Sequence, residues 1–397
     1  MTTSPDDSVR ETSSGADFLR PVNPATAFRS FHEYTLADLD ALRVILRGGS
    51  VIDWHRLNFR HDDDIIEFLA SHEIDLEDPG DLDRMHDVMA EAIEYLRRKF
   101  EYPIPASIEM ATPIELFRYA AGKGHKQVCA CMILKVMHII HHLQGRELSF
   151  MLPMSDQEVF RLVEEKVYRV VGGMLTSGLP IVEFLGGRKQ RDSLYTKLLS
   201  KRETIAAQIY DKLRFRIVTR DKFDLLPVVN YLSRKLFPFN YAIPGESTNT
   251  IVDFDGLLSS DPHLASLAPM VQGLPGDRSK PMPDNAFSAK NYQVVHFVVD
   301  LPVRIPDRVL ELAPAESAEL GRVVFVLVEF QIVDQVTEQA NEKGEASHAR
   351  YKERQRMAVM ERLRMGFREH AAVRAQMDDL TMEHLAPPRS LDLEDDE

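Results

Sequence analysis

The chain has 397 residues, 44% of them hydrophobic, which is enough for two soluble domains or one large domain with an appendage. Its formal net charge of -14 argues against a general binder of polyanions, although one site can differ from the total. Residues 1–17 lack an apolar segment and the most apolar run, residues 128–143, is too short to span a bilayer, so we expect a cytoplasmic protein without membrane contact.

The first part of the chain has the pattern of helices. After a tail over residues 1–27, Thr35 is placed to cap a helix that ends at Gly48. Helical periodicity then recurs over residues 62–72, 81–100, about 113–143 and 156–174. We therefore expect an all-helical domain over residues 28–178.

The pattern changes near residue 179, where strands and helices begin to alternate. Strands are predicted over residues 212–219, 292–299 and 323–333, with a helix over about 223–236 between the first two. This is typical of an α+β domain, placed at residues 179–377, with a mixed β-sheet flanked by helices. Gly, Pro, Ser and Asp gather over residues 245–288, which predicts a long surface insertion, and residues 378–397 form an acidic tail.

The predicted strand 323–333 carries a carboxylate where only apolar residues are expected. Every residue in it is apolar except Glu329 and Gln331, and the period of two places these side chains on one face. A buried carboxylate costs several kcal/mol unless a cation or hydrogen-bond donors meet it. We therefore expect a metal ion or a basic side chain opposite Glu329.

A basic segment stands out in this acidic protein. Residues 188–222 hold eleven Lys or Arg and four Asp or Glu, a local field suited to phosphates, although a solvated basic helix is the simpler interpretation. Lys189, Ser193 and Lys197 are four residues apart and share a helical face. In the strand that follows, Lys212, Arg214 and Arg216 alternate with apolar residues and share one strand face, which either lines a pocket or faces solvent.

These segments resemble a known family. E-F-Q-I from Glu329, followed by N-E-K-G-E-A-S-H-A-R-Y-K ending at Lys352, resembles the E-I-Q-I and A-E-x-G-x-A-x-H-x-x-Y-K signature of RelA/SpoT-type (p)ppGpp synthetases. The resemblance implies a nucleotidyltransferase-like domain that moves pyrophosphate from ATP to the 3′-hydroxyl of a guanine nucleotide. It covers about residues 186–352.

Further motifs extend the resemblance. Y-D-K-L-R-F-R-I-V resembles Y-D-x-x-x-x-R-I-I, which implies that Asp211 holds Mg²⁺ together with Glu329 and that Arg216 lies near phosphates. The remaining implied site residues fall into two groups. ATP phosphates would be bound by Lys189, Ser193 and Lys197, with Arg188 beside them; the acceptor nucleotide would be bound by Tyr292, which stacks on the base, and by Gln331, His296, His348 and Lys352.

The chain also departs from the family pattern. Gly187 stands where the family has an Arg, Asn291 replaces a Gly, and Val333 replaces an Arg that helps to hold phosphates. N-Y-A-I-P from Asn240 loosely resembles the family's D-Y-I-A-x-P, and N-Y-Q-V-V-H from Asn291 resembles its G-Y-Q-S-L-H. The insertion at 245–288 separates these two segments, which are normally close in sequence. Three hypotheses follow: a Mg²⁺-dependent enzyme acting on ATP and a guanine nucleotide; the same chemistry on an adenine nucleotide or the 3′ end of tRNA; or a nucleotide-binding or protein-interaction module that has lost catalysis. The oligomeric state is left open.

Overall fold

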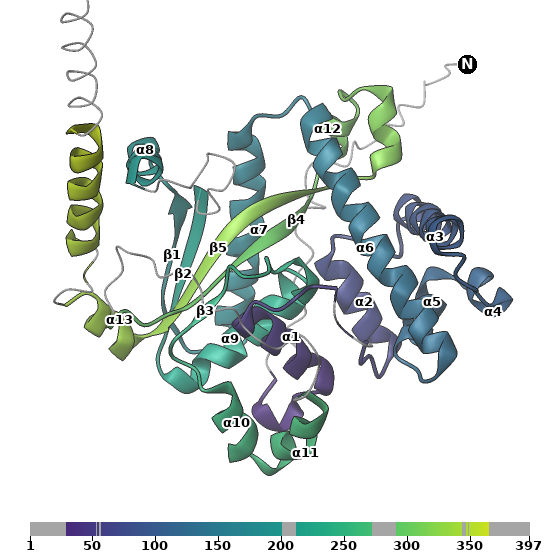
Figure 1. The fold of residues 1–397 in the computed structure, drawn as a ribbon, viewed down its shortest axis with the longest axis horizontal. Helices are drawn as coiled ribbons and strands as arrows, with labels where there is room; N and C mark the ends of the chain where they lie inside the picture. The colour runs from purple at the N-terminus through teal and green to yellow at the C-terminus, as the bar shows by residue number, and fades with distance from the viewer. Residues whose placement is uncertain are drawn as a thin grey trace, which may run out of the picture.

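The computed structural model describes residues 29–52, 54, 57–200, 212–271, 291–343, 347 and 349–364 (Figure 1). A mixed five-stranded sheet stands in the middle, and helices cover it. The strands lie in the order β1-β2-β5-β4-β3. Their bounds are β1 Ile181–Arg188, β2 Leu213–Thr219, β3 Thr248–Asn249, β4 Val295–Arg304 and β5 Val323–Asp334.

The sheet is mixed because one pair of its strands is parallel. β2 and β5 run parallel, and the pairs β1–β2, β4–β5 and β3–β4 are antiparallel. β5 has a neighbour on each side and is almost fully buried, as its apolar sequence predicts. The predicted α+β class, a mixed sheet flanked by helices with helices preceding it in the chain, is confirmed.

The helices form two groups along the chain. Those before the sheet are α1 Leu36–Arg47, α2 Asp62–Ser71, α3 Pro79–Phe100, α4 Ala106–Glu109, α5 Pro113–Ala120, α6 His125–Met151 and α7 Asp156–Thr176. Those within or after it are α8 Arg191–Ser200, α9 Leu225–Lys235, α10 Phe254–Ser260, α11 Pro262–Val271, α12 Asp307–Leu310 and α13 Gln335–Asn341, followed by a helix at residues 349–364. Short 3-10 turns add η2 Phe31–Glu33, η5 Lys222–Asp224, η6 Phe239–Tyr241 and η7 Ala315–Leu320.

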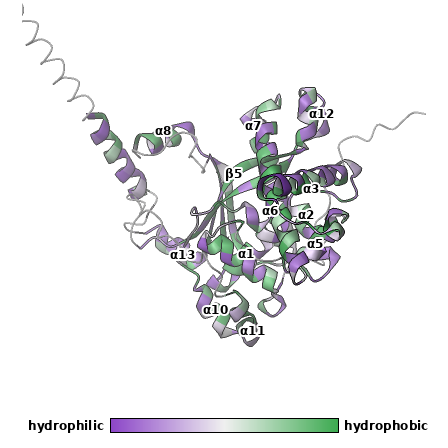
Figure 2. Ribbon diagram, turned by 45° about the vertical axis from the view of Figure 1, so that its right-hand side comes forward, coloured by the Kyte–Doolittle hydropathy of each residue, from purple (hydrophilic) through white to green (hydrophobic). Residues whose placement is uncertain are grey.

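Two hydrophobic cores hold these elements together. One combines the inner side of the sheet with α1, α7 and α9, and the other lies among α2, α3, α5 and α6. Thus α1 and α7, which belong to the predicted helical domain of residues 28–178, pack with the sheet. The domain boundaries themselves stay a prediction. Figure 2 shows green, apolar residues along the sheet and on the inner sides of the helices around it.

Helix α6 covers part of the other side of the sheet. Gly145 lets it approach closely, because a Cβ there would lie 2.4 Å from the Phe325 ring. The buried Asp300 of β4 accepts hydrogen bonds at 2.6 Å from His142 and from Arg146, both on α6. A close apolar contact and a buried carboxylate that binds two α6 side chains therefore fix α6 on the sheet.

Several local predictions need correction. Residues 181–188 form strand β1, which was not predicted, because two glycines and an exposed edge position hide its alternation. Within the predicted insertion, α10 and α11 bury Phe254, Leu258, Leu264 and Val271 in the first core.

Helix α6 is longer than the predicted apolar run. At 27 residues, it is the one helix within the described residues that is long and apolar enough to cross a membrane by length and composition alone. That is weak evidence, because core helices of soluble proteins pass the same test, and α6 packs on α3, α5 and β5.

Candidate functional site

Two rows of polar side chains cross the sheet on the part of its α6-facing side that α6 leaves uncovered. In the first row, Arg214 of β2 is paired with Glu329 of β5. In the second row, Arg216 of β2 is paired with Gln331 of β5, which is paired in turn with His296 of β4. Residues directly opposite each other in a ladder point to the same face, so these five side chains form one polar surface.

Glu329 is the buried anion of this surface. Its residue is 7% exposed, and its Oε1 accepts a hydrogen bond from Gln331 Nε2 at 2.6 Å. His296 Nε2 lies 3.3 Å from the same oxygen. Arg214 occupies the paired position on β2, which is where the cost of burying Glu329 predicts a basic side chain.

Arg216 connects three elements around Glu329. It donates to Gln331 Oε1 at 2.9 Å, to Glu338 Oε1 at 2.6 Å and to the Tyr292 hydroxyl at 3.3 Å. Burial by itself would lower the pKa of Arg216, but the nearby Tyr292 and Glu338 outweigh it, so its pKa is raised and the guanidinium stays charged. Arg216 therefore acts as a fixed cation that positions Gln331 and Tyr292.

Tyr292 lies just before β4 rather than inside it, which corrects the predicted start of that strand. Its ring packs against Val218, Val294 and Val333, and its hydroxyl faces Arg216. Burial raises the pKa of the Tyr292 hydroxyl, and the positive charge of Arg216 offsets only part of that rise. The side chain is therefore a neutral ring held in place at the margin of the polar surface.

Helix α13 supplies residues that the sequence analysis did not assign to the site. Asp334 caps it through the N–H groups of Val336 and Thr337. Glu338 binds Arg216, and Asn341 holds the backbone of Gln293, accepting from its N–H at 3.1 Å and donating to its carbonyl at 2.7 Å. The spacing of four and then three residues from Asp334 was a usable signal, because it places all three on one helical face.

The predicted phosphate-binding residues separate into two groups. Lys189 follows β1, and its N–H donates to the Lys212 carbonyl at 2.9 Å, next to the row of Arg214 and Glu329. Ser193 and Lys197 lie on α8. Arg188 points to the opposite face, where it binds Glu164 of α7 with two hydrogen bonds of 3.0 Å. The structure thus keeps Arg188 away from the polar surface.

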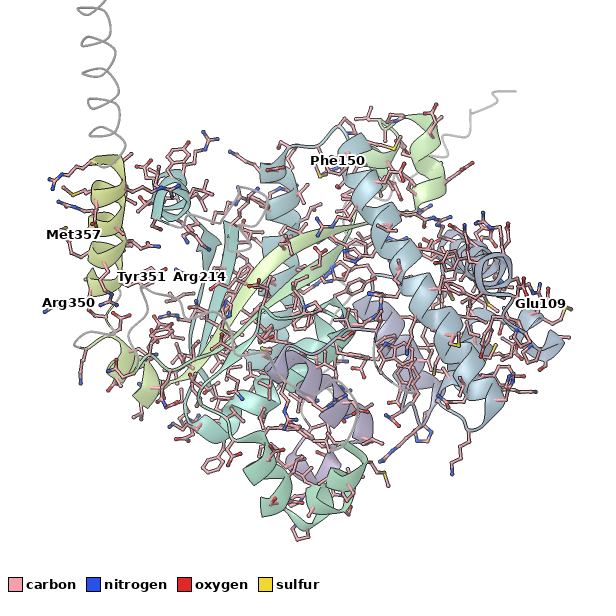
Figure 3. The ribbon with its side chains drawn as sticks, viewed as in Figure 1. Glu109, Phe150, Arg214, Arg350, Tyr351 and Met357 are labelled. Carbon is pink, nitrogen blue, oxygen red and sulfur yellow. The ribbon has the colours of Figure 1, made fainter. Side chains whose placement is uncertain are left out.

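The last predicted residues lie on the segment after α13. Lys352 is exposed on the helix of residues 349–364, which also carries Arg350, Tyr351 and Met357 (Figure 3). This helix is tied to α8 by a 2.9 Å hydrogen bond from Arg362 to the Leu199 carbonyl. Asp211 and His348 are outside the described residues.

The described residues can be tested against the requirements of a Mg²⁺ ion. None of them form a group of three or more His, Cys, Asp or Glu that could hold a metal on their own. Mg²⁺, however, is commonly bound by one or two carboxylates together with substrate phosphates, and it keeps several waters. Glu329, a carboxylate beside a cationic strand, fits that mode with a nucleotide present.

The fold and the surface together define an α+β protein with a buried carboxylate, cationic side chains and an aromatic ring on one face of a mixed sheet. No family model matches the chain, and no curated protein matches it. Among solved structures, the small alarmone synthetase 1 from Bacillus subtilis is 14% identical with a TM-score of 0.26, over 56% of this chain and 100% of that one.

Two further structures give similar values. The small alarmone synthetase 2 from Bacillus subtilis is 16% identical with a TM-score of 0.24, over 52% of this chain and 90% of that one. A GTP pyrophosphokinase family protein from Streptococcus pneumoniae is 15% identical with a TM-score of 0.21, over 50% and 80%. Similarity this weak assigns no function to this chain.

Proposed function

We propose that this chain is a Mg²⁺-dependent pyrophosphotransferase that moves the β,γ-pyrophosphoryl group of ATP to the 3′-hydroxyl of a guanine nucleotide. The observation that carries the proposal is the register of β2, β5 and β4, which sets Glu329 opposite Arg214 and beside His296 and Gln331. The motifs that resemble the RelA/SpoT-type synthetases fall on these same strands.

The charges of the surface favour a polyanionic substrate. Arg214 and Arg216 stand on β2, within the basic segment of residues 188–222. From the same segment, Lys189, Ser193 and Lys197 lie at the adjacent edge of the sheet. Arginine and lysine in a partly buried site bind phosphate oxygens through charge-assisted hydrogen bonds. ATP would lie with its phosphates between α8 and the row of Arg214 and Glu329.

The acceptor would lie on the side of Tyr292. A nucleobase can stack on its ring, which contributes about 1 to 3 kcal/mol and does not by itself distinguish guanine from other bases. Gln331 and His296 lie between this ring and Glu329, where they can bind the ribose hydroxyls. Such an arrangement brings the 3′-oxygen and the β-phosphorus of ATP together, which lowers the entropic part of the barrier.

The reaction forms one bond and breaks one. The acceptor 3′-oxygen attacks the β-phosphorus of ATP, the bond between that phosphorus and the oxygen bridging to the α-phosphate breaks, and AMP leaves. Glu329 accepts the proton of the 3′-hydroxyl, while Arg214, Lys189 and Lys197 bind the charged oxygens of the transferred group. Mg²⁺ held by Glu329, and by Asp211 as the motif implies, would neutralise phosphate charge when bound.

The proposal is tested by incubating the full chain with γ-labelled ATP, Mg²⁺ and, in separate reactions, GDP, GTP, ADP or uncharged tRNA. We expect label on GDP or GTP, equimolar AMP, and a rate at least about 100-fold lower for Glu329→Gln. Glu316→Gln, an exposed position in η7, is the matched control and should leave the rate unchanged.

Two results would contradict the proposal. Label that moves only to ADP or tRNA would keep the chemistry and change the acceptor. Binding of ATP without any transfer to the four acceptors would identify a nucleotide-binding module without catalysis. The loss of the family's arginines at Gly187 and Val333 would then explain the missing activity.

A further inference from the structure

A second pocket lies among the helices, away from the polar surface of the sheet. Its volume is about 620 Å³, within the range of roughly 300 to 1,000 Å³ in which proteins bind small molecules. It is enclosed by α2, α3, α5 and α6 together with η6 and η7, and most of its wall is apolar or aromatic, including Trp54, Phe68, Phe117 and Met137.

One wall of the pocket carries an ordered chain of polar side chains. His72 Nδ1 lies 2.8 Å from the Phe68 carbonyl and therefore donates to it, which leaves His72 Nε2 as an acceptor. The side-chain amide of Asn240 points its nitrogen at that atom, at 3.5 Å, and at His138 Nδ1, at 3.1 Å. The Asn240 oxygen is then turned away from both imidazoles.

Four buried polar atoms of the lining residues have no hydrogen-bond partner among the described residues. They are Asn240 Oδ1, the Tyr241 hydroxyl and His141 Nε2 on this wall, and Arg84 Nε on α3. Asn240 and Tyr241 are 6% and 2% exposed, and both line the pocket. Leaving a buried polar group unsatisfied costs about 1 to 3 kcal/mol. Because Asn240 and Tyr241 belong to the lining, a molecule in the pocket that reaches these atoms and hydrogen-bonds to them would relieve that cost.

The charge of the pocket restricts what that molecule can be. Five carboxylates line it against two guanidinium groups, and Asp83, Asp87 and Glu319 are exposed at its rim. Burial lowers the pKa of His72 and His138 to about 3 and that of His141 to about 4, so the imidazoles add no positive charge at neutral pH. Because the lining holds more carboxylates than guanidinium groups, a phosphate or carboxylate ligand is disfavoured there relative to an uncharged one.

We infer that this pocket is a second ligand site, which takes an uncharged, mainly apolar molecule with an N–H or O–H donor at one edge. The apolar body packs among Trp54, Phe117 and Met137, and the donor meets Asn240 Oδ1 beside the Tyr241 hydroxyl. The inference is independent of the function proposed for the sheet face. It differs from that function in kind, because the sheet face selects negative charge and this pocket rejects it.

The test uses two fluorescent probes with the same aromatic body. N-phenyl-1-naphthylamine is uncharged and has one N–H, while 1-anilinonaphthalene-8-sulfonate adds a negative charge to that body. With the full chain at pH 7.5, we expect saturable one-to-one binding of the uncharged probe and at least 10-fold weaker binding of the sulfonate. No saturable binding, or equal binding of the two probes, would overturn the inference.

A pair of variants locates the probe. Ala318 is an exposed residue of η7 at the rim of the pocket, and Ala315 is an exposed residue of the same turn that does not line it. We expect Ala318→Trp to weaken binding of the uncharged probe at least 10-fold and Ala315→Trp to change it less than 2-fold. Since both positions are exposed, both variants should fold, which near-ultraviolet circular dichroism checks. Equal binding by the two variants would place the probe elsewhere and refute the assignment.

Discussion

The sheet face and the helical pocket use ionisable side chains in opposite ways. On the sheet face, Arg216 keeps its charge because Glu338 and Tyr292 surround it, and Glu329 is buried beside Arg214. In the pocket, His138 and His141 lose their charge to burial. Cations with anionic partners make a surface that can bind phosphates, whereas imidazoles buried without a charged partner become neutral hydrogen-bonding groups in an apolar wall.

The two regions are both lined by side chains of strand β5. Odd-numbered residues of β5 face one way, so that Val323 lines the pocket, Phe325 contacts α6, and Glu329 and Gln331 form the polar surface. The position of α6 decides which part of the face is apolar and covered. Variants can therefore alter one region and leave the other unchanged.

The largest effect is expected from Arg214→Met, which keeps much of the side-chain volume and removes the charge opposite Glu329. We expect the rate of pyrophosphate transfer to fall about 100-fold, because one cation that stabilises the transferred group is lost. Binding of the uncharged probe to the pocket should not change. The measurement is label transfer at saturating substrate, and an unaltered rate would show that Arg214 has no role in the site.

A pH-dependent effect is expected from His141→Phe in the pocket. The pKa of His141 is about 4 in the folded protein and about 6.5 when unfolded, so acid protonates the unfolded chain first. The wild type therefore loses stability from this residue as the pH falls from 6.5 towards 4, and the variant does not. The free energy of unfolding of the variant minus that of the wild type should therefore be about 2 kcal/mol larger at pH 5 than at pH 7.5.

Urea unfolding at the two pH values measures this change. His86→Phe, at an exposed position of α3, controls for the loss of a histidine as such. A pH-independent difference between His141→Phe and the wild type would contradict a buried, neutral imidazole at this position.

Glu338→Ala tests whether α13 positions the site. The substitution removes the carboxylate that fixes Arg216, which in turn holds Tyr292 and Gln331. We expect KM for the acceptor to rise about 10-fold with a smaller change in kcat, because an interaction formed with both bound substrate and transition state is weakened. Glu338→Gln should recover part of the loss through a neutral hydrogen bond. A fall in kcat alone would assign Glu338 a different role.

The smallest expected effect is tighter binding of ATP by a variant at Gly187. Gly187 is paired with Arg214 and faces open space, so an added side chain enters the polar surface. We expect Gly187→Arg to tighten ATP binding about 5-fold by adding one phosphate contact. At Gly186 a Cβ would lie 2.5 Å from the Phe215 ring, so Gly186→Arg should destabilise the fold instead. Weaker ATP binding in Gly187→Arg would mean that phosphates do not lie here.

The sequence predicted the parts of this molecule that depend on local pattern. The continuous apolar run made β5 recognisable, and Glu329 stood out within it because its charge contradicts its surroundings. Thr35 and Gly48 delimit α1 as predicted, with Gly48 at φ +63°. Strand β1 was not predicted, because an edge strand with two glycines carries little alternation.

Other features depend on contacts between distant segments. The role of Glu338 requires knowing that α13 packs beside β2, and the direction of Arg188 is set by Glu164 on α7. The pocket requires four helices and two turns to meet. The sequence motif around Asn240 does not place it beside two imidazoles, and only these neighbours reveal how its oxygen is oriented.

The measurement that tests the contrast most directly is the salt dependence of two bindings to the same sample. α,β-Methylene-ATP with Mg²⁺ and N-phenyl-1-naphthylamine would each be titrated at 50 and 500 mM NaCl. We predict that the nucleotide binds at least about 10-fold more weakly at high salt, and that the uncharged probe binds equally well or slightly more tightly, in the presence or absence of nucleotide. Parallel salt dependence, or displacement of the probe by the nucleotide in direct competition, would contradict two sites of opposite character.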